Sequence, residues 1–381
     1  MKICDVVINS IWSDPRVKKQ IQSYVDNGIE LECVGIIEPR YRKEEVEKIP
    51  CKVRLADIPL NFYSAKRNIF TKIFRELYIQ KKVYKEILKT APDIIHANDL
   101  NALIPAYKVA KKLKCKLIYD THEIFLENPW IARNPLVKLL WGTYEKRIIS
   151  KVDLVVCVSH AAGKYLEQKY AISSPLVVTN CISKKNQIHG TCPKAEPKQI
   201  LNHGQFYEGR GYDIMVETAS LVDEHQDLQF VLRGFGTMEN QLRNRVKELG
   251  VNNVSFAPPV KVEELIPEAA HAWVALAITE AISLNFKLSV SNKIFEYAAA
   301  GLPVIMSDIP EHRYLNDKYN FGIILESDTP ECLAAAINKM YTDQELYNTY
   351  VRNVHILSRE VNWDNEFGKL IKFEKELVKE I

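Results

Sequence analysis

Short runs rich in β-branched residues alternate with longer amphipathic stretches along the whole chain, and this alternation narrows its possible folds more than any other feature. Such alternation is typical of parallel sheets with helical crossovers. A chain of 381 residues is long enough for two such domains. We expect strands at residues 2–8, 31–37, 93–97, 116–120, 154–159, 199–204, 228–234, 253–257, 273–278, 302–307 and 321–325.

The stretch 183–199 is polar, contains proline and glycine, and has no apolar period, which favours a linker. It would separate an N-terminal Rossmann-like domain, 1–182, from a C-terminal one, 200–362. We expect a last helix, 363–381, to return to the N-terminal domain.

Composition excludes several classes of protein. The chain begins without the charged and apolar regions of a signal peptide, and no apolar run approaches a membrane span. The 8 cysteines form no Cys-x-x-Cys pair and several lie in apolar runs, as in a reduced cytoplasmic protein. A net charge of +3 argues against a nucleic-acid partner.

One stretch, 63–89, is locally basic, and its apolar residues recur at helical spacing. Two interpretations remain open: a solvated helix over the core, or a surface helix that rests on anionic lipid. The lipid interpretation uses the basic residues Lys66, Arg67, Lys72, Arg75, Lys81, Lys82, Lys85 and Lys89 and the apolar residues Phe70, Phe74 and Leu77.

Ligands of parallel sheets collect beyond the carboxyl ends of strands, so the turns that follow strands are candidate sites. In the first turn, Ser13 or Asp14 can cap a helix that starts at Pro15. Arg16 would then project near the ligand edge, or merely pair with a surface carboxylate.

A second turn places His122 after a buried strand. In the sequence, Asp120 precedes His122 by two residues and Glu123 follows it directly. An imidazole there can bond a substrate hydroxyl or stabilise developing charge. The alternative is a histidine satisfied within the fold.

A glycine-rich turn, 203–213, follows the strand at 199–204. Gly204, Gly209 and Gly211 let the backbone approach a phosphate, and Arg210 adds a planar cation. The Lys and Ser or Thr of a P-loop are absent, which argues against a nucleoside triphosphatase.

A short helix in 289–303 would start at Ser291 or Asn292 and end before Gly301. Its free N–H groups and Lys293 suit a diphosphate, and the Glu296 carboxylate could accept both hydroxyls of a ribose. An ordinary amphipathic helix is the alternative.

Together these segments resemble the retaining glycosyltransferases of family 4, whose GT-B fold has two Rossmann-like domains facing across a cleft. The resemblance covers nearly the whole chain and is most specific in NKIFEYAAAGLPVIMSDIPE. The other segments are SDPRV, DIIHAND, YDTHE, VSHAAGKYL, Asn180 and the glycine loop.

The resemblance implies an enzyme that moves a sugar from a nucleotide-diphosphate donor, such as a UDP-sugar, to a glycan or lipid-linked acceptor of cell-surface polysaccharide synthesis. It implies retention of configuration, no cofactor and no metal, and the chain has no Asp-x-Asp motif for a divalent ion. His122, Arg210 and Lys293 would be catalytic, with His122 facing the donor sugar. Donor-binding residues would be Gly204, Gln205, Gly209, Gly211, Ser291, Asn292 and Glu296, and acceptor-side residues Ser13, Arg16, Asp120 and Glu123.

Two positions depart from the family pattern. Gln205 stands where many members have Arg, and Leu288 where many have a Glu that contacts the transferred sugar. Asn285, Lys287 or Glu280 could partly replace these groups. The departures leave open an inactive sugar-nucleotide-binding partner, and the shared architecture leaves open a nucleotide-sugar 2-epimerase.

Overall fold

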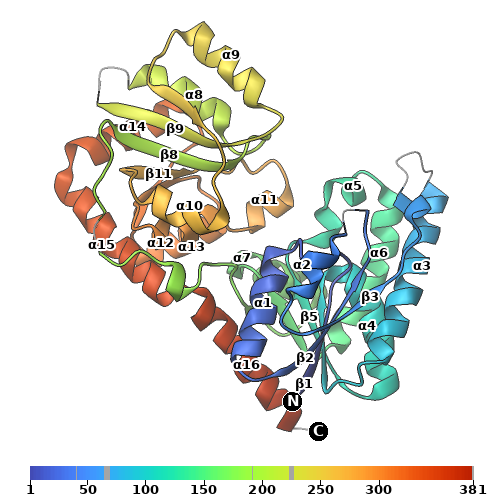
Figure 1. The fold of residues 1–381 in the computed structure, drawn as a ribbon. Coiled ribbons are helices and arrows are strands. Elements are labelled where there is room, and N and C mark those ends of the chain that lie inside the picture. The colour runs from blue at the N-terminus through green and yellow to red at the C-terminus, as the bar shows by residue number, and fades with distance from the viewer. Residues whose placement is uncertain (40, 64–68, 191, 223–226, 380–381) are drawn as a thin grey trace. The chain divides into compact units, whose positions relative to one another are not determined.

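The computed structural model describes the chain except residues 40, 64–68, 191, 223–226 and 380–381. The chain divides into two compact units (Figure 1). Unit 1 comprises Met1–Val178 and Glu366–Ile381, and unit 2 comprises Thr179–Asn365. Among the described residues, no helix combines the length and the apolar character needed to cross a membrane.

Unit 1 is built on a 7-stranded sheet in which every pairing is parallel, in the order β3-β2-β1-β4-β5-β6-β7. Its interior strands are apolar because both faces are covered by helices. The strands are β1 (Lys2–Val6), β2 (Glu30–Ile36), β3 (Lys52–Ala56), β4 (Ile94–Asn98), β5 (Lys116–Thr121), β6 (Leu154–Cys157) and β7 (Leu176–Val177).

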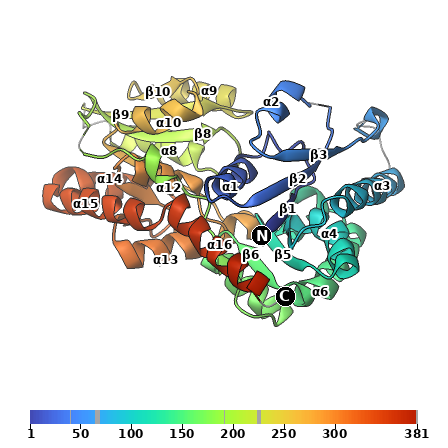
Figure 2. The same cartoon turned by 60° about the horizontal axis from the view of Figure 1, so that its bottom comes forward.

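Helices α3, α4 and α6 lie over one face of this sheet, and α1 and α16 lie side by side over the other (Figures 1 and 2). The ring of Tyr24 in α1 meets Phe367 of α16 edge-on, with centroids 4.9 Å apart. The helices are α1 (Pro15–Asp26), α2 (Lys43–Glu47), α3 (Ile69–Leu88), α4 (Asp99–Leu113), α5 (Pro129–Ala132), α6 (Pro135–Ile148), α7 (His160–Tyr170) and α16 (Trp363–Lys379), with short 3₁₀ turns η1 (Leu60–Tyr63), η2 (Phe125–Glu127) and η3 (Ile149–Lys151).

Unit 2 has a 6-stranded parallel sheet in the order β10-β9-β8-β11-β12-β13. Its strands are β8 (Lys198–Gln205), β9 (Leu228–Phe235), β10 (Val254–Ala257), β11 (Val274–Ala277), β12 (Val304–Met306) and β13 (Gly322–Ile324). Its helices are α8 (Tyr212–Leu221), α9 (Glu239–Leu249), α10 (Val262–Ala269), α11 (Leu284–Leu288), α12 (Asn292–Ala299), α13 (Pro310–Tyr319), α14 (Pro330–Thr342) and α15 (Gln344–Glu360), with the 3₁₀ turn η4 (Lys184–Asn186).

The predicted class, α/β with two Rossmann-like domains, is confirmed, and each predicted strand is present. The prediction omitted β3, an edge strand whose Lys52 and Arg54 interrupt the apolar run, and β7, which has 2 residues. Residues 183–199 lie within unit 2, where Gln187 donates to the carbonyl of Ser358.

Candidate functional site

The glycine-rich turn of unit 2 begins where β8 ends. Gly204 has a φ of +134°, and a Cβ atom there would lie 3.2 Å from Cε of Lys293. Gly211 has a φ of +66°, and its Cβ would lie 2.3 Å from Cγ2 of Ile278. Glycine is therefore needed at both positions for conformation, and at Gly211 also for space. The turn is fixed further by Glu280, whose Oε1 accepts from the Gly211 amide at 3.2 Å.

Lys293, in the first turn of α12, extends to this glycine turn. Its Nζ donates to Oδ1 of Asn202 at 2.6 Å and lies 5.6 Å from the ring centroid of Tyr212. Burial, reinforced by the positive charge of Arg210, lowers the pKa of Lys293 from 10.5 to about 7. An anion bound here would favour the charged ammonium, because it supplies the opposite charge that the ligand-free pocket lacks.

Glu296 lies one turn further along α12 and faces His203 of β8. The Oε2 atom of Glu296 is 2.6 Å from Nε2 of His203, and the His203 amide donates to the Tyr297 hydroxyl at 3.0 Å. The His203 side chain is buried, whereas that of Glu296 is partly exposed. The Glu296 carboxylate is thus fixed by His203 on one side, while its exposed part can accept hydrogen bonds from a ligand that carries hydroxyl groups.

Arg210 lies half-buried in the glycine turn, close to two aromatic rings. Its guanidinium is 4.5 Å from the ring centroid of Phe286 and 5.2 Å from that of Tyr207. Its Nε and Nη2 donate to the Tyr207 hydroxyl at 3.1 and 2.9 Å. Stacking fixes the plane of a guanidinium, which suits it to a phosphate.

The N-terminus of α12 is held by a neutral histidine. Ser291, one of the two residues predicted to mark the helix start, is the N-cap residue, but its side chain makes no capping bond. The Ser291 amide donates to Nε2 of His312 at 3.4 Å, and the Nδ1–H of His312 donates to the carbonyl of Ser307 at 3.0 Å. Burial lowers the pKa of His312 to about 4, so its Nε2 stays an acceptor at neutral pH. The Ile294 amide donates to the Ser291 carbonyl at 3.0 Å, so the amides of Asn292 and Lys293 are the ones placed to meet an anion.

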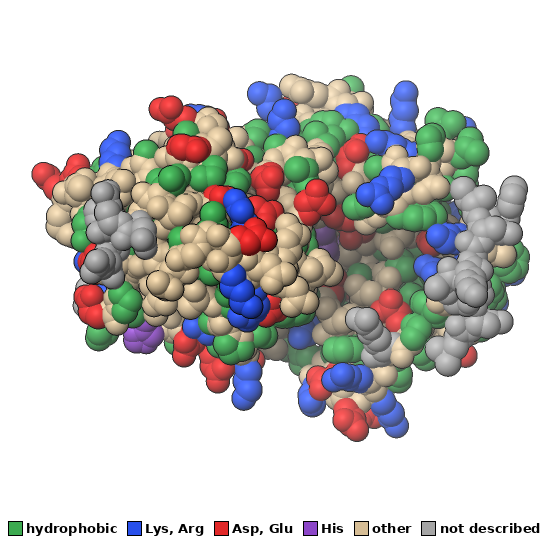
Figure 3. Space-filling view, turned by 90° about the horizontal axis from the view of Figure 1, so that it is seen from above, with side chains coloured by type: hydrophobic (Ala, Val, Ile, Leu, Met, Phe, Trp, Pro, Cys, Tyr) green, Lys and Arg blue, Asp and Glu red, His purple; other side chains and the backbone are tan. Residues whose placement is uncertain are grey.

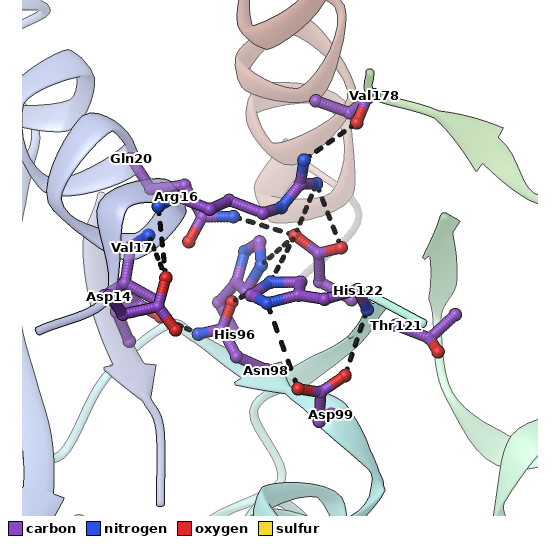
Figure 4. Close-up of polar contacts among 12 residues, drawn as sticks. Asp14, Arg16, Val17, Gln20, His96, Asn98, Asp99, Thr121, His122 and Val178 are labelled. Carbon is purple, nitrogen blue, oxygen red and sulfur yellow. Dashed lines mark hydrogen bonds and ion pairs between the residues drawn. The ribbon is translucent and has the colours of Figure 1, made fainter. Parts of the chain in front are cut away.

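In unit 1 the structure corrects the expected position of Arg16. Asp14 caps α1 by accepting from the amides of Arg16 and Val17, and Pro15 is its first residue. The Arg16 side chain, however, is 4% exposed and turns inward (Figure 4). Its Nη2 donates to both oxygens of Asp120, at 3.1 and 3.0 Å, and Nη1 to the carbonyl of Val178. The inward position is favoured because a buried carboxylate such as Asp120 is costly unless cations and hydrogen-bond donors surround it.

His122 follows β5 directly and is held by side chains from two neighbouring elements (Figure 4). Its Nε2 lies 3.0 Å from Oδ1 of Asn98, and its amide donates to Oδ1 of Asp99 at 3.0 Å. Burial alone would lower the pKa of His122, but the carboxylates of Asp99 and Asp120 outweigh it and raise the pKa. The ring is therefore oriented and biased toward its charged form.

The other predicted residues lie at the edges of these clusters. The Ser13 hydroxyl is 3.4 Å from that of Ser10, Glu123 is exposed and accepts from Asn128 at 3.5 Å, and Gln205 and Asn292 are exposed. Sequence reasoning missed the partners of the predicted groups, although NHG and HAND place five of them at strand ends. The missed partners are Gln20, His96, Asn98, Asp99, Asn202, His203, Tyr297 and His312.

In unit 2, then, two cations, a helix N-terminus and an anchored carboxylate gather around one glycine turn. Such a set can bind a diphosphate and a vicinal diol. Within the described part of the chain, no three His, Cys, Asp or Glu side chains gather as they would to hold a metal ion.

Comparison with solved structures identifies the fold class of the chain. Sucrose-phosphate synthase from Thermosynechococcus elongatus superposes with a TM-score of 0.78 at 14% identity, with 100% of each chain covered. The Anabaena protein HepE, solved in complex with UDP and glucose, gives 0.72 at 16% identity, with 99% of this chain and 100% of that one covered. The fold is thus GT-B.

Sequence comparison then identifies the family. Residues 18–183 match the protein family described as "Glycosyltransferase Family 4", and residues 197–343 match the family described as "Glycosyl transferases group 1". The O-antigen biosynthesis glycosyltransferase WclY of Escherichia coli is 22% identical over 307 residues, 76% of this chain and 82% of the relative. The chain belongs to glycosyltransferase family 4, group 1, and is an enzyme of that type.

Proposed function

We propose that the protein transfers a sugar from a UDP-sugar to a glycan or lipid-linked sugar in cell-surface polysaccharide synthesis. The observation that carries the proposal is the position of Lys293, whose partly buried Nζ lies beside Gly204 at the N-terminus of α12, one turn before Glu296. The E. coli relative, named for O-antigen biosynthesis, and HepE, solved with UDP and glucose, support the acceptor and donor classes.

In this proposal, Lys293, Arg210 and the first-turn amides of α12 bind the donor diphosphate, and Glu296 binds the ribose. Breaking the bond between the anomeric carbon and phosphate develops charge on the departing diphosphate, which these groups stabilise. A phosphate oxygen takes the proton of the acceptor hydroxyl, which attacks on the face that the diphosphate leaves, so configuration is retained. Positive charge from the chain replaces that of a metal ion.

In unit 1, we assign His122 to the reacting sugar and the neighbouring turns, with Ser13 and Glu123, to the acceptor. The cytoplasm is the proposed location. Arg16 and Asp120 support this region from within rather than contact the acceptor, because their charged groups are buried against each other.

The decisive experiment is a thermal-shift screen against nucleoside diphosphates and nucleotide sugars, followed by transfer assays with the donor that stabilises most. A ligand at 100 times its Kd raises stability by about 2.7 kcal/mol. Donor turnover only with acceptor supports transfer. Turnover to a second nucleotide sugar without acceptor indicates a 2-epimerase, and binding without any turnover indicates an inactive partner.

We further propose that unit 1 attaches peripherally to an anionic membrane surface. On α3, Phe74 and Leu77 are 62% and 56% exposed, and Nζ of Lys72 lies 4.7 Å from the ring centroid of Trp130 in α5. Lys66, Arg67 and the side chain of Phe70 lie outside the described residues.

The same contact between Lys72 and Trp130 links α3 to an apolar surface on α6. Leu136 and Leu139 are 70% and 67% exposed there, and Leu140 is also exposed. Figure 3 shows hydrophobic side chains lying exposed among Lys and Arg on unit 1. Exposed leucines beside basic residues suit the headgroup layer of an anionic bilayer, where each Lys or Arg contributes about 1 kcal/mol.

A further inference from the structure

A carboxylate of the C-terminal helix α16 lies in the core of unit 1. Glu374 is fully buried, and its Oε1 accepts a hydrogen bond from the Tyr24 hydroxyl at 2.5 Å. The same oxygen lies 3.6 Å from Nδ1 of His96 in β4. Its second oxygen, Oε2, has no hydrogen-bond partner among the described residues. A buried carboxyl group is costly to maintain, so a purely space-filling role would be served better by an apolar side chain.

His96 joins Glu374 to the functional region. The Tyr24 hydroxyl, which donates to Glu374, accepts from Nδ1 of His96 at 3.1 Å, and Nε2 of His96 lies 3.3 Å from Oδ2 of Asp120. Both ring nitrogens therefore act as donors, as in an imidazolium. Burial opposes that charge, but the carboxylates of Asp120 and Glu374 outweigh it and raise the pKa of His96 to about 10.

Asp120 contacts both His96 and His122 and so connects the two histidines. Its Oδ2 accepts from Gln20 at 2.7 Å and lies 3.7 Å from Nε2 of His122 (Figure 4). Asn98 donates from its Nδ2 to Asp5 and to the carbonyl of Val6, so its Oδ1 is turned toward the same Nε2. Nε2 of His122 thus lies between an amide oxygen and the carboxylate that His96 contacts, both of which can accept its N–H.

We propose that Glu374 is a positioning residue, which acts through His96 and Asp120 to fix the ring of His122. The inference rests on the proposed role of His122 in sugar transfer. Without the carboxylate, the His96 imidazolium loses one of its two anionic partners. The charged form of His96 is then less stable, which weakens its contact with Asp120. Asp120 would then turn toward Arg16 and Gln20, and His122 would lose the carboxylate beside its Nε2.

Charged and titratable groups reach this cluster from several elements, and all bear on its protonation. They are Asp5 of β1, Arg16 and Tyr24 of α1, His96 of β4, Asp99 of α4, Asp120 of β5, His122 and Glu374.

The test compares Glu374→Gln with Glu376→Gln, an exposed glutamate two positions along the same helix. Gln keeps an oxygen for Tyr24 but removes the charge, and Tyr24→Phe removes the hydroxyl while keeping the charge. Each full-length variant carries labelled histidine, with the signals of His96 and His122 assigned through His96→Gln and His122→Asn. We measure histidine titrations by NMR, kcat and KM for sugar transfer, and the Kd of UDP.

For Glu374→Gln we expect a lower titration midpoint of His96, a displaced midpoint of His122, and a kcat reduced roughly 10- to 100-fold through misplacement of His122. The Kd of UDP should not change, and Glu376→Gln should match wild type. An unmoved His122 titration, or a kcat that falls only with the folded fraction, overturns the inference. If wild type binds no nucleotide, the proposed function is wrong, whatever the role of Glu374. The histidine titrations would still decide whether Glu374 acts on His122.

Discussion

The Nζ atom of Lys293 lies 2.6 Å from Oδ1 of Asn202, a neutral partner, and no carboxylate among the described residues lies at hydrogen-bond distance from it. This explains why burial lowers the pKa of Lys293 to about 7. A nucleoside diphosphate would supply the missing negative charge.

Binding of UDP should therefore take up a proton. Between pH 7 and 9 the affinity should fall as pH rises, by up to tenfold per unit, because the bound state requires the ammonium while the free enzyme loses it. Calorimetry in buffers of different ionisation enthalpy measures the uptake directly. In ligand-free protein, the folded state holds fewer protons than the unfolded one between pH 7 and 10.5, so this lysine makes stability rise with pH over that window. Lys293→Met should lose UDP affinity, remove that rise, and increase the Tm at pH 7; an unchanged Tm profile would argue against the lowered pKa.

Glu296→Gln and Arg210→Ala should each weaken UDP binding by about 1.5 to 3 kcal/mol, because each removes a charged hydrogen bond to the ligand. Glu217→Gln, in a partly exposed pair with Arg245, is the matched control. Calorimetry decides the matter, and unchanged affinity in both variants would remove the proposed donor site.

Sugar transfer should persist in excess EDTA, since Arg210, Lys293 and the N-terminus of α12 meet the phosphate charge. Initial rates with and without EDTA are compared on the same enzyme stock. Loss of activity that magnesium or manganese restores would contradict the metal-free mechanism.

Arg16→Met should destabilise unit 1 by roughly 3 to 5 kcal/mol, because it leaves Asp120 as a buried charge without its arginine. Arg313→Met breaks an exposed pair with Asp308 and should cost about 0 to 1 kcal/mol. Since two units can unfold separately, hydrogen exchange of peptides from each unit during urea titration is the appropriate measurement. Equal effects of the two substitutions would mean that the buried pair has no special weight.

Wild type should sediment with anionic but not zwitterionic vesicles, and salt should weaken the binding. Replacing Lys66, Arg67, Lys72 and Arg75 with Gln, or Leu136, Leu139 and Leu140 with Ser, should release the protein without altering UDP affinity. Leu221→Ser and Ile356→Ser, exposed residues of unit 2, are the controls. Protein that stays in the supernatant at low salt would favour a soluble acceptor.

The alternation of strand runs and amphipathic stretches was enough to predict the fold class, because interior strands of a doubly covered sheet must be apolar on both faces. Edge strands escape this rule, which is why β3, with Arg54 paired to Glu32, was not predicted. The turn residues of the site could be predicted because each follows directly after an apolar strand, whose end can be recognised in the sequence. Their partners were not, since Asp120 and Arg16 are far apart in the chain and only the folded sheet brings them within 3.0 Å.

The return of α16 to unit 1 has a consequence for biosynthesis. On the ribosome, residues Met1–Val178 emerge first, but Phe367 and Glu374, which complete their core, follow only after Thr179–Asn365. At roughly 5 to 20 residues per second, that delay is roughly 10 to 40 s. During it, Tyr24 and His96 lack their partner and the nascent unit exposes the surface that α16 later covers. The last helix therefore closes the first unit, and a chaperone has that interval in which to bind it.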